Sequence, residues 1–326
     1  MERATISSTD VQNQQPTVHM SLSRVGVTGV EKVIRIERNG REQLFWAKLE
    51  CFVDLGPEQK GAHMSRFEEV VNETIGEVVL GAAAFRAEHL AQRIAELVRE
   101  RQGARRAEVT IAARYPEHKP APVSGIPTQE LYTLFGTALA SESGTRRMIG
   151  VAAQGMTACP CAQGLVEVSA RERLAADDFT DDEIDRIVEA VPIATHNQRG
   201  LGTLHIGCPS AEDIDAETLV RIVEDSMSSE IYELMKRSDE GAVVEKAHSR
   251  PRFVEDCVRE AIRGVIEEFP QLADDAFVSA RQENLETIHQ HNVVAERHGM
   301  LGQLRAELAG GDHAADHVSA REWLES

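Results

Sequence analysis

Lysine, positive charge and long apolar runs are all scarce in this chain of 326 residues. Its 35 Lys and Arg residues include only six lysines and are outnumbered by 54 Asp and Glu residues, so the formal net charge is −19. A general nucleic-acid binder needs cationic side chains to neutralise phosphates, and this balance argues against one. No apolar run approaches the roughly 18 residues of a membrane span, and the first twenty residues lack the apolar core of a secretory signal. We therefore expect a cytoplasmic protein with no nucleic-acid partner and no membrane partner.

The acidic excess has a further implication for the host. Little lysine and a high negative charge are typical of proteins that stay soluble at very high salt, where screening weakens self-repulsion. We therefore expect a halophilic host, with an ordinary acidic bacterial protein as the alternative. The mean hydropathy of −0.30 and the 42% of hydrophobic residues indicate a globular chain, long enough for two ordinary domains or one large one.

Cysteine is sparse as well, with five residues and no visible signal peptide, so a disulfide framework is not expected. Most of the thiols should be buried. Cys159 and Cys161 differ because they flank Pro160 on a stiff segment after a predicted strand. That arrangement suits a metal thiolate, or one metal ligand beside one reactive thiol. Two structural cysteines are the alternative.

Residue spacing and turn signals predict the order of helices and strands. Strands are expected over residues 30–38, 43–53, 108–114, 131–140, 147–154, 201–206 and 276–281, with an Asn39-Gly40 hairpin turn and a Pro-rich connection over 115–127. Helices are expected over residues 67–80, 82–101, 179–190, 214–236 and 253–269, and the tail from Gly302 is expected to be peripheral. Without a regular βαβ alternation, this order favours an α+β fold with antiparallel sheets.

Two polar clusters stand out in the second half. His196, Asn197, Gln198 and Arg199 precede an apolar strand, and a buried segment rarely carries such residues without a site to serve. The alternative is an exposed loop. The second cluster, residues 286–291, contains Glu286, His289 and His291. In a helix Glu286 and His289 would share a face, and in an extended segment the two histidines would share one. Either geometry offers two metal ligands, although such pairs also occur by chance on surfaces.

Two further segments carry residues that suit a metal site or a phosphate site. Glu245 is an acid inside a mostly apolar stretch, either a carboxylate ligand or the partner of a nearby cation. Residues 60–66 form a basic turn before a predicted helix, where Arg66 and helix-end amides could hold a phosphate. A helix cap at Ser65 is the alternative. Together the Cys, His and Glu residues make a mixed S/N/O set that suits Zn(II) or Fe(II) with an open position for water.

Six stretches, taken in order, resemble GTP cyclohydrolases of type IB and their archaeal methanopterin-pathway relatives. They are SLSRVGVTGVEKVIRI, KGAHMSRF, ACPC, THNQRG, the KRSDE–VVEKA–PRFVEDCVRE run and ETIHQHN, and they span residues 20–296. The opening stretch and the long insert between Cys161 and His196 are similar to the archaeal branch. The resemblance implies a tunnelling fold, with two tandem modules of antiparallel sheet and helices packed on one face. It also implies homodimers or homotetramers with active sites at module or subunit interfaces.

The resemblance also implies boundaries and roles. A flexible N-terminus is expected over residues 1–20, the first module over 21–156, the second over 157–301 and a tail over 302–326. Each site should hold one divalent metal, Fe(II) first, with Zn(II) or Mn(II) as alternatives. The implied metal ligands are Cys159, His196, Glu245, Glu286 and His289. The implied catalytic residues are Cys159, Cys161 and His291, and the implied substrate-binding residues are Glu260 or Glu255 for guanine, with His63, Arg66 and Arg199.

The implied reaction is the conversion of GTP to 7,8-dihydroneopterin 2′,3′-cyclic phosphate, formate and pyrophosphate, the first step of pterin biosynthesis. The metal would lower the pKa of water that attacks C8, and a histidine or thiol would transfer protons. One alternative is the type IB reaction, which retains the triphosphate. A second is a tunnelling-fold nitrile reductase with a cysteine nucleophile. A non-enzymatic alternative is a metal-stabilised assembly protein whose ligand shell is closed.

Overall fold

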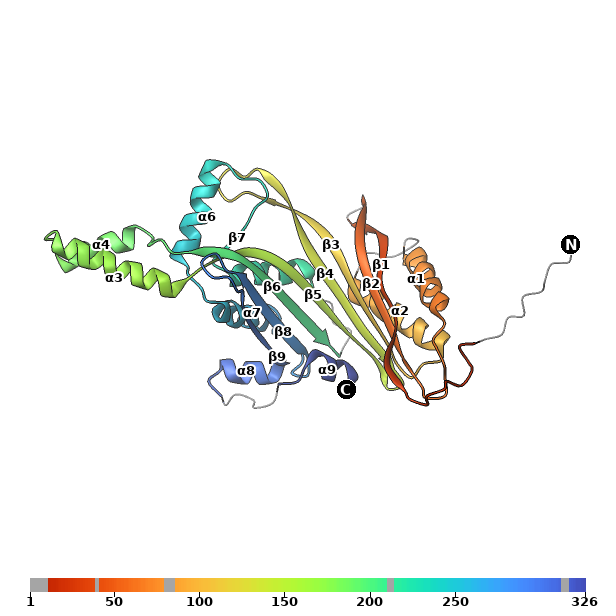
Figure 1. Ribbon diagram of the computed structural model, residues 1–326. Helices are drawn as coiled ribbons and strands as arrows, with labels where there is room; N and C mark the ends of the chain where they lie inside the picture. The colour runs from red at the N-terminus through yellow and green to blue at the C-terminus, as the bar shows by residue number, and fades with distance from the viewer. Residues whose placement is uncertain (1–10, 39–40, 79–85, 210–213, 312–316) are drawn as a thin grey trace. The chain divides into compact units, whose positions relative to one another are not determined.

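The computed structural model describes residues 11–38, 41–78, 86–209, 214–311 and 317–326 (Figure 1). Its strands in this part of the chain are β1 (Leu22–Arg38), β2 (Arg41–Leu55), β3 (Ala107–Pro120), β4 (Pro127–Ser141), β5 (Gly144–Ala158), β6 (Asn197–Cys208), β7 (Ser229–Glu230), β8 (Phe277–Leu285) and β9 (Val293–Met300). Its helices are α1 (Met64–Val78), α2 (Ala87–Gln102), α3 (Pro160–Ala176), α4 (Asp181–Ala190), α5 (Ala216–Ser226), α6 (Arg237–Ser249), α7 (Val254–Glu268), α8 (Leu301–Leu308) and α9 (Ala320–Glu325).

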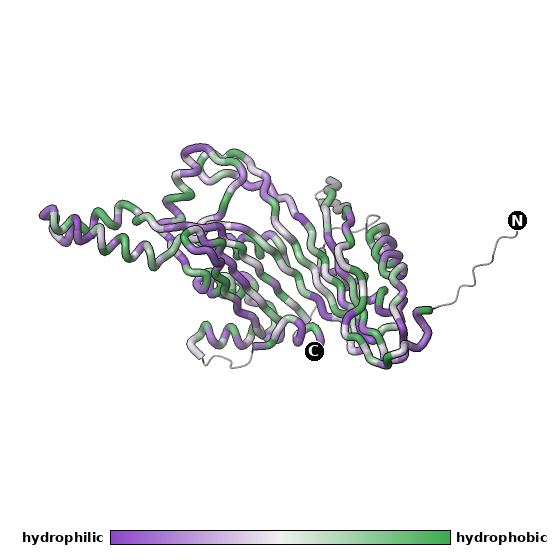
Figure 2. Tube along the Cα trace, viewed as in Figure 1, coloured by the Kyte–Doolittle hydropathy of each residue, from purple (hydrophilic) through white to green (hydrophobic). Residues whose placement is uncertain are grey.

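The strands form an antiparallel sheet in the order β1-β2-β3-β4-β5-β6-β8-β9, and the short β7 pairs with β5. Buried and partly exposed residues alternate along β3 and β4, as a sheet with one face against a core requires. Figure 2 shows the same alternation of hydrophobic and hydrophilic residues along the strands. The predicted α+β class, with an antiparallel sheet and helices packed on one face, is confirmed.

The chain divides into two compact units, and each is described by itself. The first comprises the described residues of Met1–Ala113, Phe135–Met148 and Leu324–Ser326. Here α1 and α2 pack on each other and on β1 and β2. Gly136 is required in β4, because a Cβ there would lie 2.1 Å from the backbone carbon of Ala87 at the start of α2. The sheet and helix therefore approach more closely than a side chain would allow.

The second unit comprises Arg114–Leu134 and the described residues of Ile149–Trp323. Helices α5 and α7 pack on each other, α5 also on β6, and α7 also on β8 and β9. Trp323 is 1% exposed, stacks on Phe277 at a centroid distance of 5.9 Å, and donates to the carbonyl of Asp275. The prediction that the tail is peripheral is therefore wrong at this residue, because an indole of this size gains more from burial than its short segment costs to order.

Most predicted elements are present, usually with longer bounds, and two predictions are wrong. The connection predicted over 115–127 is largely strand: β3 runs to Pro120, and its register with β2 ends at Ala113. Pro116 and Pro120 therefore lie where β2 takes no N–H from β3, which is where a strand tolerates proline. The helix predicted over 214–236 ends at Ser226, because the next residues are used by β7, where Ser229 pairs with Met156.

Helices α3, α6, α8 and α9 and strands β7 and β9 have no counterpart of the same kind among the predicted elements. The predicted Asn39-Gly40 turn lies outside the described residues, as do residues 1–10 of the predicted N-terminus, residues 79–80 of the first predicted helix and residues 82–85 of the second. The module boundary at residues 156 and 157 stays a prediction. No helix in the described part of the chain is both long enough and apolar enough to cross a membrane.

Candidate functional site

The end of β5 and the start of β6 bring Cys159 and His196 together in the second unit. Cys159 follows β5 directly and is the N-cap residue of α3, while His196 directly precedes β6. The main-chain N–H of Cys159 donates to the carbonyl of His196 at 3.1 Å, and the Thr195 hydroxyl donates to the carbonyl of Cys159 at 2.9 Å. Helices α3 and α4 occupy the insert between these residues (Figure 1). The long insert therefore leaves the two predicted ligands adjacent.

Glu286, which directly follows β8, lies beside His196. The register of β6 with β8 pairs Arg199 with Leu285, so the next residue, Glu286, lies beside the start of β6. Its carboxylate lies 3.9 Å from Nδ1 of His196, and the two side chains are 6% and 14% exposed. A thiol, an imidazole and a carboxylate thus come from three neighbouring segments. Donors of these kinds fit Fe(II) or Zn(II).

Gln163, near the start of α3, links the segments around Cys159 and His196 by hydrogen bonds. Its side-chain amide donates to the carbonyl of Ile193 and to the carbonyl of His248, each at 2.7 Å. The imidazole of His248, at the end of α6, also lies 3.3 Å from the carbonyl of Thr195. One amide therefore joins the start of α3, the segment before His196 and the end of α6.

Helix α6, which carries Glu245, is fixed at its other end by Asp239. That buried carboxylate accepts hydrogen bonds from the main chains of Val123, Ser124 and Lys236 and from the Ser124 hydroxyl. Burial acts to raise the pKa of Asp239, but these hydrogen bonds outweigh it and hold the pKa below its ordinary value. Glu245 itself is exposed, so α6 positions it without burying it.

The segment over residues 286–292 is neither a helix nor a strand, so both predicted geometries are wrong. It forms bends between β8 and β9, and the Thr287 hydroxyl donates to the carbonyl of Asn197. His289 and His291 are exposed, and their rings stack with centroids 5.2 Å apart and an interplanar angle of 15°. The short connection bends because β8 and β9 must turn back to pair with each other.

The five predicted metal ligands fall into two groups. Cys159, His196 and Glu286 lie on adjoining segments, whereas Glu245 and His289 expose their side chains. Within the residues that the structure describes, no three His, Cys, Asp or Glu side chains are close enough together to hold a metal ion. The donor chemistry fits a divalent metal, and a complete ligand shell requires the exposed donors to move or a second chain to contribute.

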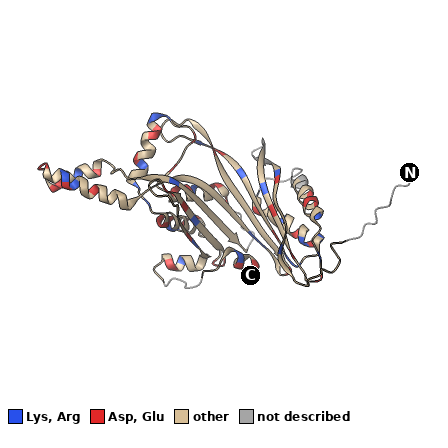
Figure 3. Cartoon of the chain, in the orientation of Figure 1, with Lys and Arg blue, Asp and Glu red and all other residues tan. Residues whose placement is uncertain are grey.

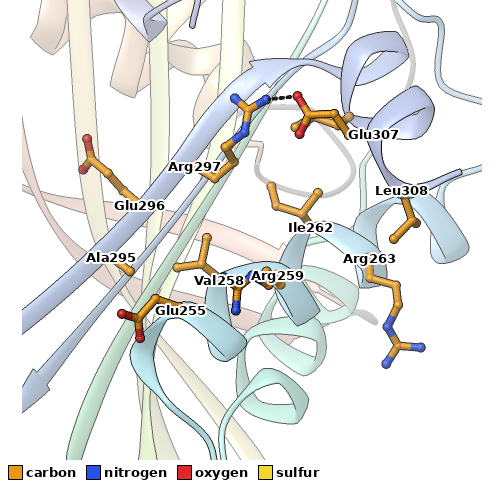
Figure 4. Close-up of a pocket in the computed structure, with 11 residues that line it drawn as sticks. Glu255, Val258, Arg259, Ile262, Arg263, Ala295, Glu296, Arg297, Glu307 and Leu308 are labelled. Carbon is orange, nitrogen blue, oxygen red and sulfur yellow. Dashed lines mark hydrogen bonds and ion pairs between the residues drawn. The ribbon is translucent and has the colours of Figure 1, made fainter. Parts of the chain in front are cut away.

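The acids predicted to anchor guanine lie on α7. Glu260 is paired with Arg252 and Arg263. Burial acts to raise the pKa of Glu260, but the hydrogen bond from Arg263 and the charge of Arg252 lower it below its ordinary value. Glu255 is exposed and lines a cavity of about 350 Å³ between α7, β9 and α8, with Val258 and Ile262 among its apolar walls (Figure 4). A cavity of this size can hold a small molecule.

The remaining predicted substrate-binding residues have structural partners. In the second unit, the Arg199 guanidinium donates to the side chain of Gln154 at 3.0 Å. In the first unit, the main-chain N–H of His63 donates to the Gln102 side chain, and Arg66 donates to the carbonyl of Arg101. Both contacts join α1 to the end of α2. Ser65 lies inside α1 rather than before it, so the alternative of a cap at Ser65 is wrong.

Sequence reasoning gave no role to three side chains that the structure places at the centre of this site: Gln163, Gln198 and Thr157. Gln198 contacts His196 and is 5% exposed, and Thr157 is fully buried. A signal was available for Gln198. Residues two apart on a strand share a face, so the His-Asn-Gln order at a strand start predicts an amide beside the imidazole.

Comparisons with known proteins identify the family of this chain. The family model described as type I GTP cyclohydrolase folE2 matches residues 9–295. A protein named GTP cyclohydrolase MptA from Methanococcus aeolicus is 42% identical over 305 residues, covering 92% of this chain and 99% of the relative. The protein of the same name from Haloarcula marismortui is 43% identical over 302 residues, covering 92% and 97%.

Among solved structures, the chain is similar to uricase from Arthrobacter globiformis, with a TM-score of 0.48 and 8% identity over 85% of this chain and 93% of that one. A uricase from Bacillus fastidious gives a TM-score of 0.47 and 10% identity over 90% and 99%. The family match carries the assignment, since it extends over most of the chain and includes both strand ends that hold Cys159 and His196. The chain belongs to the family of type I GTP cyclohydrolases described as folE2.

Proposed function

We propose that this chain is a metal-dependent GTP cyclohydrolase of pterin biosynthesis that converts GTP to 7,8-dihydroneopterin 2′,3′-cyclic phosphate, formate and pyrophosphate. The observation that carries the proposal is the placement of Cys159, His196 and Glu286 on adjoining segments at strand ends. The relatives named GTP cyclohydrolase MptA support the same substrate, and the similarity to the archaeal branch supports the cyclic phosphate.

In this proposal Cys159, His196 and Glu286 hold one divalent metal, with Fe(II) preferred, and Glu245 and His289 complete its shell. When bound, such a metal supplies Lewis acidity and lowers the pKa of water near neutral pH. The exposed thiol of Cys161, two residues after Cys159, transfers protons while the imidazole ring opens. His291 takes the proton of the ribose hydroxyl that attacks the α-phosphate.

The substrate would be held by charge and by an acid on α7. Glu260 or Glu255 accepts hydrogen bonds from the guanine edge, since a carboxylate is an acceptor with two oxygens. Arg199, Arg66 and His63 are the proposed contacts for phosphates, with Arg199 exposed in the second unit. Arginine suits this task because its guanidinium stays charged and forms paired hydrogen bonds with phosphate oxygens.

We also propose that the enzyme is a homodimer or homotetramer whose interface includes α3. No residue of this helix is buried. Leu165 is 69% exposed and Val168 is 55% exposed, and with Cys161 they fall on one helix face at positions i, i+4 and i+7. Residues 160–166 carry no charge, and charged residues begin at Glu167 (Figure 3). A second copy covering this face would remove apolar side chains from water beside Cys161.

Mass spectrometry of the product tests the function. The metal-free enzyme is loaded with Fe(II) under anaerobic conditions and incubated with GTP, with Zn(II) and Mn(II) in parallel reactions. We expect formate, pyrophosphate and the cyclic phosphate. A product that retains the triphosphate would assign the type IB reaction instead. No turnover of GTP with any metal, together with NADPH-dependent reduction of a nitrile, would overturn the cyclohydrolase proposal.

A further inference from the structure

Two side-chain oxygens lie near Nδ1 of His196, and one of them is within hydrogen-bond distance. The side-chain oxygen of Gln198 lies 3.1 Å from Nδ1, and a carboxylate oxygen of Glu286 lies 3.9 Å from the same atom. The imidazole is 14% exposed, so the choice of which nitrogen carries the proton is made by the protein rather than by bulk water. A neutral imidazole has one N–H donor and one acceptor nitrogen.

The orientation of the Gln198 amide follows from its other contact. Its NH₂ group donates to the Thr157 hydroxyl at 3.0 Å, which directs the carbonyl oxygen to His196. A hydroxyl could accept either orientation of the amide, since it both donates and accepts. In this structure the amide oxygen faces His196 and, because an amide oxygen only accepts, it favours a proton on Nδ1.

We propose that Gln198 is a positioning residue that keeps the proton of His196 on Nδ1 and so leaves Nε2 as the nitrogen that binds the metal. This inference rests on the proposed metal-dependent function. Histidines that bind metals commonly donate their other N–H to an acceptor of the protein, which fixes the tautomer and the ring orientation. Gln198 is built for that task, since it is 5% exposed and is itself held by the fully buried Thr157.

The same amide links the two strand ends that carry the predicted ligands. Thr157 is the second-last residue of β5 and lies two residues before Cys159. Gln198 is the second residue of β6. The bond between them lies beside the main-chain bond from Cys159 to His196. A change in the Gln198 side chain therefore alters the direction of the His196 ring relative to Cys159, and not only the proton position.

The first test measures the tautomer in metal-free protein without GTP. The full chain is labelled with ¹⁵N at histidine, and solid-state ¹⁵N spectra are recorded at a pH where the ring is neutral. The His196 signals are identified by difference from His196→Asn. We expect the Nδ1–H tautomer in the wild-type protein. An Nε2–H tautomer would overturn the proposal without any variant of Gln198, and it would leave the cyclohydrolase assignment intact.

The second test compares Zn(II) affinity by chelator competition in three variants. Gln198→Leu removes the acceptor and should weaken Zn(II) binding by about 10–100-fold, the usual effect of losing such a partner. Gln198→Glu restores an acceptor and should stay within a few-fold of the wild-type value. Gln282→Leu is the matched control, because Gln282 is also a buried amide, 2% exposed, but bonds to Asn284. Its Zn(II) affinity should be unchanged.

Equal affinities in Gln198→Leu and the wild-type protein would overturn the proposal. So would equal weakening in Gln198→Leu and Gln282→Leu, because a buried amide would then matter only for packing. If Gln198→Leu does not fold, the Zn(II) affinity of Gln198→Glu and the tautomer of His196 in the wild-type protein still test the proposal. A chain that binds no Zn(II) in any form but shows the Nδ1–H tautomer would contradict the metal-dependent function instead, so the two failures are distinguishable.

Discussion

The main-chain N–H of Cys159 donates a hydrogen bond to the carbonyl of His196 at 3.1 Å, across the base of the hairpin that α3 and α4 form. The hydroxyl of Thr195 returns a second bond to the carbonyl of Cys159. These bonds involve backbone atoms, so they do not depend on whether a metal is bound. The main chains of Cys159 and His196 are thus held together by the fold itself.

Cys159 and Cys161 should respond differently to mutation. Cys159→Ala should lose bound metal and turnover, because it removes a thiolate ligand. Cys161→Ala should keep its metal but lose turnover, because the Cys161 side chain is exposed on α3 and is proposed to transfer protons. Metal content by mass spectrometry and GTP turnover measure the two effects. Similar metal loss in both variants would show that their roles are not separate.

His289 and His291 stack on each other, yet we expect different roles. His289→Asn should weaken metal binding. His291→Asn should keep the metal and accumulate an uncyclised intermediate, because the imidazole that takes the ribose hydroxyl proton is missing. Product analysis by mass spectrometry distinguishes the two. Normal cyclic phosphate at a normal rate from His291→Asn would remove the catalytic role of that residue.

The exposed face of α3 predicts the effect of charge on assembly. Leu165→Glu combined with Val168→Glu should shift the protein toward monomers, since each carboxylate would have to be buried in the proposed interface. Analytical ultracentrifugation measures the shift. Leu308→Glu is the control, because Leu308 is 54% exposed but lies on α8 rather than α3. If the double variant and the wild-type protein have the same mass in solution, α3 is not part of the interface.

Asp239 makes the attachment of α6 sensitive to acid. Its pKa is lowered in the folded protein, so its stabilising contribution is present above the ordinary pKa of about 4 and is lost as the pH falls toward the lowered value. Asp239→Asn cannot accept all four hydrogen bonds, so it should melt at a lower temperature at pH 7. The difference from the wild-type protein should shrink in acid. Melting curves between pH 7 and pH 3 check this, and a difference that does not change with pH would contradict it.

Salt should stabilise the protein if its charge of −19 reflects a saline host. Added KCl screens the repulsion among acidic side chains, so the melting temperature should rise from low to molar KCl. Differential scanning fluorimetry across that range measures it. A melting temperature that stays flat or falls with KCl would favour the ordinary acidic protein.

The local pattern of residues predicted most of the elements but not all of their bounds. Helices such as α2 and α7 were predicted because their apolar residues recur with helical spacing, which depends only on neighbours in the chain. Helix α3 was not predicted, because it buries no residue and so carries no stripe of apolar positions that marks a packed face. Strand β9 was missed for a similar reason, since its residues alternate between partly exposed and exposed.

The sequence by itself determined which metal-ligand residues are available and which family the chain resembles, because residue types and their order do not depend on the fold. Only the tertiary structure decided which donors meet. The register of β6 with β8 places Glu286 beside His196. The hairpin of α3 and α4 brings the main chain of Cys159 within hydrogen-bond distance of the main chain of His196. Those pairings depend on hydrogen bonds between segments far apart in the chain, which no local pattern encodes. Gln198 reaches His196 through local strand geometry, whereas its hydrogen bond to Thr157 joins β6 to the end of β5 and therefore depends on the tertiary structure.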